Sequence, residues 1–291
     1  MEFTKQFLRA KSPCANGFRW FVRHIEDGVG YQQALDQLVA AGRVDDALWL
    51  LRQFGPTNAV LDVDHLDAQD MVFAGSIRVR KAVDVDGVLH VGRGLRAGGG
   101  IRVGGALATG EDVRAGGHIR ADAGLDCGGD LRAGWGLELQ GPLRCGGELR
   151  VAWDLVCQGD VQVAGGAHVG QDVAVQGTLS CGKGLRVGGH LQGTHSLRVG
   201  QGIVVGGAIA GVMHLEAGWG IRAGESIQAN GAIKAGESLS AGDEISAGAG
   251  YGIFAGLNVQ EDAWEASAQV HASRPPQGLR SGLWMGQAEF A

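Results

Sequence analysis

Between residues 71 and 262 the chain repeats a unit of six residues in which apolar and polar positions follow a fixed order. The unit LRAGWG at residues 131–136 is representative: position 1 is a large aliphatic residue, position 3 is a small one, and position 4 is mostly Gly. Alternate side chains of an extended chain share a face, so positions 1 and 3 point inward and position 2 points outward. Each unit therefore predicts a very short β-strand followed by a glycine-rich corner, and the period does not suit an amphipathic helix.

The outward position 2 indicates how many units form one coil. Arginine recurs there at multiples of 18 residues, and His168 fills one gap in the series Arg78, Arg96, Arg114, Arg132, Arg150, Arg186 and Arg222. Three units per coil explain this spacing. The predicted fold is mainly β, a single-stranded triangular β-helix of about 11 coils of 18 residues, stacked about 4.8 Å apart.

This repeat resembles two kinds of triangular β-helix, the hexapeptide-repeat helices of many acyltransferases and the bactofilins. The resemblance covers residues 71–262 and is architectural, because no functional motif of either family is matched. Hexapeptide-repeat helices are left-handed, whereas bactofilins are right-handed and polymerise into bacterial filaments. In the left-handed signature a larger aliphatic residue precedes Gly, but here V-G and A-G place the small residue there, so both hands stay open.

The segment before the repeat predicts a small α-helical module at residues 1–58. Ser12 is the expected helix N-cap, with Pro13 at the first helical position, and a later helix is expected to end at Gly55 and Pro56. Its aromatic and aliphatic residues are expected to pack as a core, and they are Phe18, Trp20, Phe21, Leu35, Leu38, Trp49, Leu50 and Phe54. Because the ends of a coil stack expose unpaired strands, we expect this module to act as a cap.

The predicted β-helix itself comprises residues 59–262, and the period breaks down in the segment that follows. Residues 263–291 bring together Trp264, Leu279, Leu283 and Trp284, which predicts a C-terminal cap. A chain that is capped at both ends is a poorer candidate for open-ended polymerisation than an uncapped one.

Composition narrows the class of protein. The chain has 53 Gly, 5 Pro and 45% hydrophobic residues, which excludes collagen-like and disordered chains. Its net charge of −6 disfavours general nucleic-acid binding, although a local basic strip keeps that partner open. The N-terminal residues lack the apolar stretch of a secretory signal, and no segment is apolar enough for a membrane span. We therefore expect a soluble, cytoplasmic protein.

Five cysteines occur without a Cys-x-x-Cys pair, which does not suit a disulfide framework or a structural zinc site. Four of them occupy the small inward position 3 and are expected to be reduced and buried, namely Cys127, Cys145, Cys157 and Cys181. The nine His are dispersed without a His-Glu-x-x-His motif, and GVGYQQ and CGKGLR lack the remaining residues of nucleotide loops. We expect no cofactor, no metal and no catalytic residues.

Two surface regions are candidate binding sites. The first is one face of the β-helix, with two tryptophans at position 5 of successive coils, and comprises Arg96, Arg114, Arg132, Trp135, Arg150, Trp153, His168 and Arg186. The alternative is that this face is neutralised, because Asp112, Asp130 and Glu148 each lie two residues before an arginine.

The second region is an irregular part of the repeat. Gly193 and Gly211 replace the inward residue in adjacent coils, which predicts a bulge with exposed Met213 and Val212. The candidate patch is His190, Thr194, His195, Met213 and His214. The alternative is a locally adjusted core with solvated histidines.

These observations favour a non-catalytic β-helical interaction protein that binds a macromolecular partner, and we expect that partner to be a protein. A bacterial inhibitor of the immunity type, which neutralises a toxin, is one version of this hypothesis. The alternatives are a bactofilin-like filament subunit and a hexapeptide-type acyltransferase. A homo-oligomer is compatible with each: end-to-end stacking would favour the filament, and a trimer with a His between subunits would favour the transferase.

Overall fold

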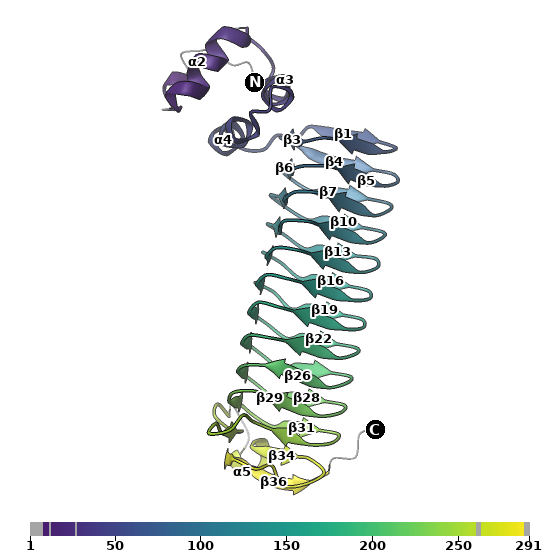
Figure 1. Cartoon of the computed structure of the whole chain (residues 1–291), viewed down its shortest axis with the longest axis vertical. Helices are drawn as coiled ribbons and strands as arrows, with labels where there is room; N and C mark the ends of the chain where they lie inside the picture. The colour runs from purple at the N-terminus through teal and green to yellow at the C-terminus, as the bar shows by residue number, and fades with distance from the viewer. Residues whose placement is uncertain (1–7, 12, 27, 260–262, 288–291) are drawn as a thin grey trace.

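The chain folds into a small helical module followed by a long column of stacked coils (Figure 1). The computed structural model describes residues 8–11, 13–26, 28–259 and 263–287. The helical elements are α2 (Ala15–His24), α3 (Tyr31–Ala40) and α4 (Val44–Phe54) in the module and α5 (Trp264–Ser267) at the far end of the column.

Three parallel sheets run along the column, and each coil contributes one strand to each sheet. Sheet 1 contains β1 (Val60–Val63), β4 (Ser76–Val79), β7 (Leu95–Ala97), β10 (Val113–Ala115), β13 (Leu131–Ala133), β16 (Leu149–Val151), β19 (Ala167–Val169), β22 (Leu185–Val187), β25 (Ile203–Val205), β28 (Ile221–Ala223), β31 (Leu239–Ala241), β34 (Gln269–His271) and β36 (Leu283–Gly286). Sheet 2 contains β2 (Leu66–Ala68), β5 (Val83–Val85), β8 (Ile101–Val103), β11 (Ile119–Ala121), β14 (Leu137–Leu139), β17 (Leu155–Cys157), β20 (Val173–Val175), β23 (Leu191–Gly193), β26 (Ile209–Val212), β29 (Ile227–Ala229) and β32 (Ile245–Ser246). Sheet 3 contains β3 (Met71–Phe73), β6 (Leu89–Val91), β9 (Leu107–Thr109), β12 (Leu125–Cys127), β15 (Leu143–Cys145), β18 (Val161–Val163), β21 (Leu179–Cys181), β24 (Leu197–Val199), β27 (Leu215–Ala217), β30 (Ile233–Ala235), β33 (Ile253–Phe254) and β35 (Leu279–Ser281).

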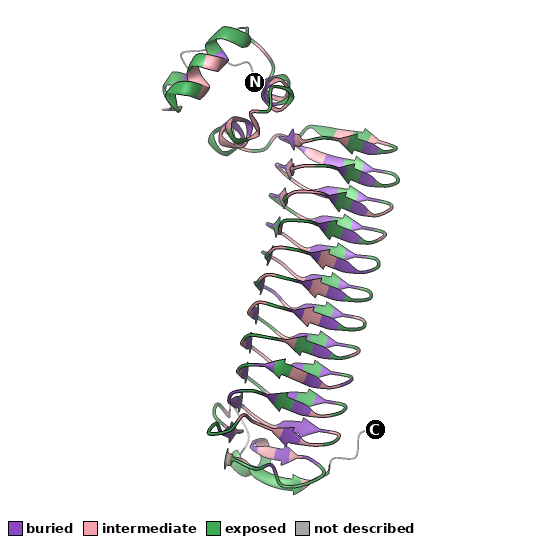
Figure 2. Cartoon of the chain, in the orientation of Figure 1, coloured by how far each residue is buried: buried purple, intermediate pink, exposed green. Residues whose placement is uncertain are grey.

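The register between coils is 18 residues, so equivalent positions of the unit stack on one another. In sheet 1, for example, Leu131 pairs with Leu149 and Arg132 with Arg150. Positions 1 and 3 are buried and position 2 faces outward, which produces the alternation of buried and exposed residues seen in Figure 2. The predicted β-helix with three units per coil is confirmed. It has about 12 turns rather than 11, because strands outside the six-residue repeat extend both ends of the stack.

The coils approach one another most closely at the corners, and this is where glycine is required. A Cβ on Gly116, at position 4, would lie 2.1 Å from the carbonyl oxygen of Gly98 in the preceding coil. By contrast, a Cβ on Gly184, at position 6, would lie 3.5 Å from the carbonyl oxygen of Gly202, which is an ordinary contact. The conformation at Gly116 therefore leaves no room for a Cβ, whereas Gly184 is not required for that reason.

We predict that Gly116→Ala lowers the free energy of unfolding by about 1–3 kcal/mol, because the added methyl group forces two coils apart. Gly184→Ala is the matched control and is expected to change it by less than about 0.5 kcal/mol. Thermal and denaturant unfolding followed by circular dichroism measures both. Equal stability of the two variants would contradict the close approach at Gly116.

Side chains at position 6 supply hydrogen bonds where the chain turns between strands. Asp172 Oδ1 accepts from the backbone N–H of His190 in the next coil at 2.7 Å. His190 Nδ1 then accepts from the N–H of Ala208 at 3.1 Å. A Cβ on Gly207 would lie 2.5 Å from this Nδ1, so the glycine before Ala208 leaves room for the imidazole ring. Carboxylates and imidazoles at position 6 thus continue the hydrogen bonding between coils around the corners.

Replacing Asp172 by Ala should lower the free energy of unfolding by about 1 kcal/mol, because the N–H of His190 loses its acceptor. Asp172→Asn keeps an oxygen at the same place and is expected to retain most of the stability. Urea unfolding of the three proteins tests this, and an Asn variant as unstable as the Ala variant would count against the corner hydrogen bond.

The helical module has its own small core. Phe21, Leu35, Leu38 and Leu50 are buried in it, and the remaining predicted aromatic residues pack against them, as expected. The predicted start of the first helix is wrong: α2 begins at Ala15, and its N-cap is Cys14, whose Sγ accepts from the N–H of Gly17 at 3.2 Å. Ser12, the expected N-cap, lies outside the described residues. The end of α4 at Phe54, before Gly55, agrees with the prediction.

Gln32 of α3 connects the module to the first strand of sheet 3. Its amide Nε2 donates to the carbonyl oxygen of Val72 at 2.9 Å, and its Oε1 accepts from the N–H of Ala74 at 2.9 Å. These two backbone groups belong to the edge strand β3 and its end, so one side-chain amide takes the place of a neighbouring strand. The side chains of Val72 and Ala74 are buried in the helical core.

Gln32→Ala is expected to lower the midpoint of thermal unfolding, with a loss of about 1–3 kcal/mol, because it leaves two backbone groups of β3 without these partners. Gln33→Ala changes the exposed neighbouring residue and should have little effect. Differential scanning fluorimetry and urea unfolding measure the stability of both variants. Equal stability of the two variants would contradict the role of Gln32 at the edge of β3.

The regular repeat ends earlier than the sequence predicts. The strand after β32 is β33, in which Ile253 pairs with Ile233, a separation of 20 residues instead of 18. Tyr251, which begins a unit in the sequence, is exposed, and the described part of the last predicted unit, 257–259, forms no strand. The C-terminal segment then adds β34, β35 and β36 to the stack, so it extends the sheets as well as ending the column.

Candidate functional site

The arginines at position 2 form a single column on the outer face of sheet 1, which we call the arginine ladder. The register pairs each member with the next, in the order Arg78, Arg96, Arg114, Arg132, Arg150, His168, Arg186, Val204 and Arg222. All nine residues are exposed. The predicted alignment of these side chains on one face is confirmed, and only His168 and Val204 interrupt the arginines.

The two tryptophans lie at one border of this face. Trp135 and Trp153 follow β13 and β16 of sheet 1, at the corner that leads to sheet 2, and the N–H of Trp153 donates to the carbonyl oxygen of Trp135 at 3.3 Å. They are 65% and 61% exposed, the largest exposed fractions among the large apolar side chains described. An exposed apolar pair therefore lies beside Arg132 and Arg150, as the spacing predicts.

Carboxylates neutralise part of the arginine ladder. Asp112 Oδ2 accepts from Arg114 at 2.7 Å, and its Oδ1 accepts from the N–H of Asp130 in the next coil at 2.9 Å. Asp130 repeats the arrangement with Arg132 at 3.3 Å. The N–H of Glu148 and, after it, the charge of Arg132 lower the pKa of Asp130. The alternative reading of a neutralised face is therefore correct for Arg114 and Arg132.

The ion pairs between ladder arginines and position-6 carboxylates stop after the coil that carries Arg132. Glu148, the next residue of the acidic series, makes its ion pair with Lys183 at 3.1 Å instead of with Arg150. Within the described parts of the chain, no carboxylate lies at salt-bridge distance from the remaining arginines of the ladder, which are Arg78, Arg96, Arg150, Arg186 and Arg222. The face thus combines neutralised and unneutralised guanidinium groups.

The structure divides the second predicted patch. His190 lies at the corner between sheets 1 and 2, whereas Thr194, His195, Met213 and His214 lie at the corner between sheets 2 and 3. The grouping of His190 with the other four is therefore wrong, because sheet 2 separates the two corners. His190 serves as an acceptor between coils, with Glu225 Oε2 at 3.9 Å from its Nδ1.

The predicted bulge is present, but it buries one of the residues that was expected to be exposed. Gly211 has φ +79° and shifts the register of β26, so that Val212 turns inward and is 1% exposed. A Cβ on Gly193 would lie 3.0 Å from Val212 Cγ1, so this valine fills the space that Gly193 leaves in the preceding coil. Met213 remains exposed.

The polar groups at this corner serve the backbone. Thr194 Oγ1 and His195 Nδ1 both contact the carbonyl oxygen of Gln176, the latter at 2.7 Å. His214 Nδ1 accepts from the N–H of Ala232 at 3.1 Å, and its ring meets Tyr251 edge-on. The alternative of a locally adjusted core therefore accounts for His214 and the bulge, and Met213 is an exposed large apolar side chain at this corner.

A groove on sheet 1 was missed in the sequence. It has a volume of about 630 Å³ and runs along the corner between sheets 3 and 1. Gly166, Gly184 and Gly202 of position 6 are among its lining residues, together with ladder residues and Trp219. A column of glycines at every third unit was the sequence signal, but glycine is so frequent in the repeat that the column did not stand out.

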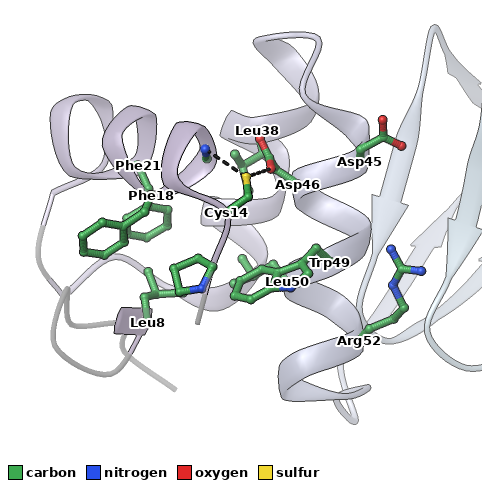
Figure 3. A pocket seen from close by; sticks show the side chains of 12 residues that line it. Leu8, Cys14, Phe18, Phe21, Leu38, Asp45, Asp46, Trp49, Leu50 and Arg52 are labelled. Atoms are coloured by element: carbon green, nitrogen blue, oxygen red, sulfur yellow. Dashed lines mark hydrogen bonds between the residues drawn. The ribbon is translucent and has the colours of Figure 1, made fainter. Parts of the chain in front are cut away.

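The helical module contains a separate apolar pocket of about 450 Å³ (Figure 3). Phe18 and Phe21 of α2 and Trp49 and Leu50 of α4 line it. Cys14 also lines it, but its Sγ is engaged as the N-cap and lies 3.8 Å from Asp46 Oδ1. Asp45, Asp46 and Arg52 also line the pocket, so its apolar walls carry three charged side chains.

The four cysteines of the repeat are buried and unpaired, as predicted. Burial raises the pKa of Cys181 to about 12, which disfavours a reactive thiolate. Among the described residues, no group of three His, Cys, Asp or Glu side chains is arranged to hold a metal ion. None of the described helices combines the length and apolar character needed to cross a membrane.

Comparison with known proteins adds information on the helical module. Residues 1–54 match the model of the YdhT N-terminal domain. The matched range ends at the last residue of α4 and includes none of the coils. No curated protein and no solved structure matches the chain. The resemblance to hexapeptide-repeat and bactofilin helices therefore holds for the architecture, and the comparisons support neither family.

Proposed function

We propose that this chain is a non-catalytic β-helical interaction protein that binds a protein partner through sheet 1 and the corner bearing Trp135 and Trp153. The observation that carries the proposal is the combination of two widely exposed tryptophans and unneutralised arginines on one continuous face. Trp and Arg are the residue types most enriched among those that dominate binding energy at protein interfaces. An inhibitor of the immunity type, from a bacterium, is one form that such a protein would take.

The architecture supports binding by a preformed surface. Each coil is hydrogen-bonded to its neighbours in all three sheets, and the outward side chains are carried by strands rather than by long loops. A partner that docks on such a face does not have to order a flexible segment, so less of the contact energy is lost on association. Rigid rows of side chains suit recognition of one partner.

The same feature supports a non-catalytic role. From β3 to β32 the units follow one another without an inserted loop. In the hexapeptide-type acyltransferases, to which the repeat has an architectural resemblance, a catalytic His usually lies near a loop that projects from the coils. The histidines on this column instead include His190 and His214, which accept backbone hydrogen bonds. We keep the cytoplasm as the expected location, which suits the unpaired thiols.

The helical module argues against the alternative function, a filament of end-to-end copies. Polymerisation of a coil stack requires the edge strands of one copy to meet those of the next. At sheet 3, the groups of Val72 and Ala74 that would meet another strand are already bonded to Gln32. This supports a discrete protein rather than an open-ended polymer.

The proposal predicts that Trp135→Ala combined with Trp153→Ala weakens partner capture at least about tenfold, since two exposed anchors are removed. The tagged full-length protein is incubated with lysate of its source organism, crosslinked, and the captured proteins are quantified by mass spectrometry. The matched control carries Arg144→Ala and Arg198→Ala, two exposed arginines on sheet 3. A supporting result is a protein captured by wild type and control and lost with the tryptophan variant.

Circular dichroism confirms that each variant is folded before capture is compared. A protein captured equally by wild type and the tryptophan variant contradicts this binding face. Growth of the wild type into large species with rising concentration, measured by light scattering after size exclusion, would favour the filament instead.

A further inference from the structure

The groove on sheet 1 consists of two adjoining parts. Its first part is lined by Arg150, Arg186, Lys183 and Trp219, and its second part, of about 480 Å³, by Arg222 and further coils. Val204 lines both parts. The groove therefore follows the column axis, beside the arginine ladder, over the coils that carry Arg150 to Arg222.

The groove coincides with the part of the ladder where no carboxylate of the described residues forms an ion pair with an arginine of the ladder; Glu148 and Glu237 line the groove, but Glu148 pairs with Lys183. Position 6 at the corner between sheets 3 and 1 holds Asp112 and Asp130 in the upper coils, where they pair with Arg114 and Arg132. In the groove the same position is occupied by Glu148 at one end and then by Gly166, Gly184, Gly202 and Gly220. Space and unneutralised guanidinium groups thus occur together, where the upper coils have acidic side chains.

Coil packing does not require two of these glycines. A Cβ on Gly184 or on Gly202 would lie 3.5 Å and 3.4 Å, respectively, from the nearest carbonyl oxygen. At Gly116, by contrast, an added Cβ would lie 2.1 Å from a carbonyl oxygen of the preceding coil. Side chains would fit at residues 184 and 202, and their absence keeps the groove open.

We infer that this groove binds an extended acidic segment of a protein partner, whose carboxylates take the places that Asp112 and Asp130 occupy in the upper coils. The inference rests on the proposed function and specifies the chemistry of the partner. Arg150 and Arg186 are two coils apart, and so are Arg186 and Arg222. Two coils span about 9.6 Å, and three residues of an extended or polyproline II segment span about 9–10 Å. An acidic residue at every third position therefore matches the arginines.

Apolar surface within the groove favours a peptide over a nucleic acid. Val204 lies between Arg186 and Arg222 and is 40% exposed, and Trp219 on the border is 45% exposed. Glu148, which is paired with Lys183, and Glu237 also line the groove, so its positive charges are not continuous. This spacing suits separate carboxylates on a peptide better than an unbroken row of phosphates. A peptide with spaced carboxylates and intervening apolar side chains satisfies both kinds of surface.

The test uses fluorescence anisotropy with defined probes and the full-length protein. The first probe is a labelled peptide of three Glu-Pro-Ala repeats, the second has Lys in place of Glu, and the third is a labelled oligo-dT strand of similar length. We expect the acidic peptide to bind, the basic peptide not to bind, and the affinity for the acidic peptide to fall when NaCl is raised from about 50 to about 500 mM. The oligonucleotide should bind more weakly than the acidic peptide.

Gly184→Asp locates the binding site. It places a carboxylate two residues before Arg186, as Asp112 stands before Arg114, and should weaken the acidic peptide at least about tenfold by neutralising and filling the groove. Gly94→Asp is the matched control: it is in the same column beside Arg96, it has similar space for a Cβ, and it lies outside the groove. It should leave peptide binding unchanged, and both variants should unfold near the temperature of the wild type.

Three results would overturn the inference: no binding of the acidic peptide, equal weakening by Gly184→Asp and Gly94→Asp, or tighter binding of the oligonucleotide. These failures can be told apart from failure of the proposed function. If the peptide does not bind but a captured protein still depends on Trp135 and Trp153, only the groove assignment is wrong. If the peptide binds but no captured protein depends on the tryptophans, the binding face has to be reassigned.

Discussion

Hydrogen bonding between successive coils is the interaction on which the rest of the structure depends. Parallel strands spaced about 4.8 Å apart have to meet in all three sheets at once, so every coil needs the same path and nearly the same length. At the corners this spacing brings backbone against backbone, and only a residue without a Cβ fits at places such as Gly116. Where the N–H groups of a corner have no strand partner, a side chain such as Asp172 provides the acceptor.

The same constraint creates the rows of outward side chains on the column. Because each coil repeats the path of the previous one, position 2 becomes a row of side chains and position 6 becomes a row along a corner. A carboxylate in that corner row can accept one hydrogen bond from the ladder arginine of its own coil and another from a backbone N–H of the next coil, as Asp112 does. A glycine there, as at Gly184, leaves the neighbouring Arg186 without an internal partner. Position 6 therefore has a strong influence on whether a stretch of the face is neutralised, although Glu148 at this position pairs with Lys183 instead of Arg150.

At the two ends of the column, the strands have no further coil with which to pair their backbone groups. At the start, the amide of Gln32 bonds to the edge of β3 and ties the helical module to sheet 3. At the other end, the 18-residue register gives way at Ile253, and the last strands of sheet 1 come from the C-terminal segment. The match of residues 1–54 to a separate domain family agrees with a module that has its own core.

The sequence by itself determined the β-helix, its three strands per coil, the buried cysteines and the alignment of the arginine ladder, because these follow from a strict period acting through short-range geometry. Tertiary structure decided what depends on distances across the corners. Sequence spacing could not show that His190 lies on the far side of sheet 2 from His195, that Val212 turns into the space left by Gly193, or that Glu148 pairs with Lys183 instead of Arg150. It also could not separate glycines required by coil contact from those that keep a groove open, because the difference lies in the distance to the backbone of the neighbouring coil.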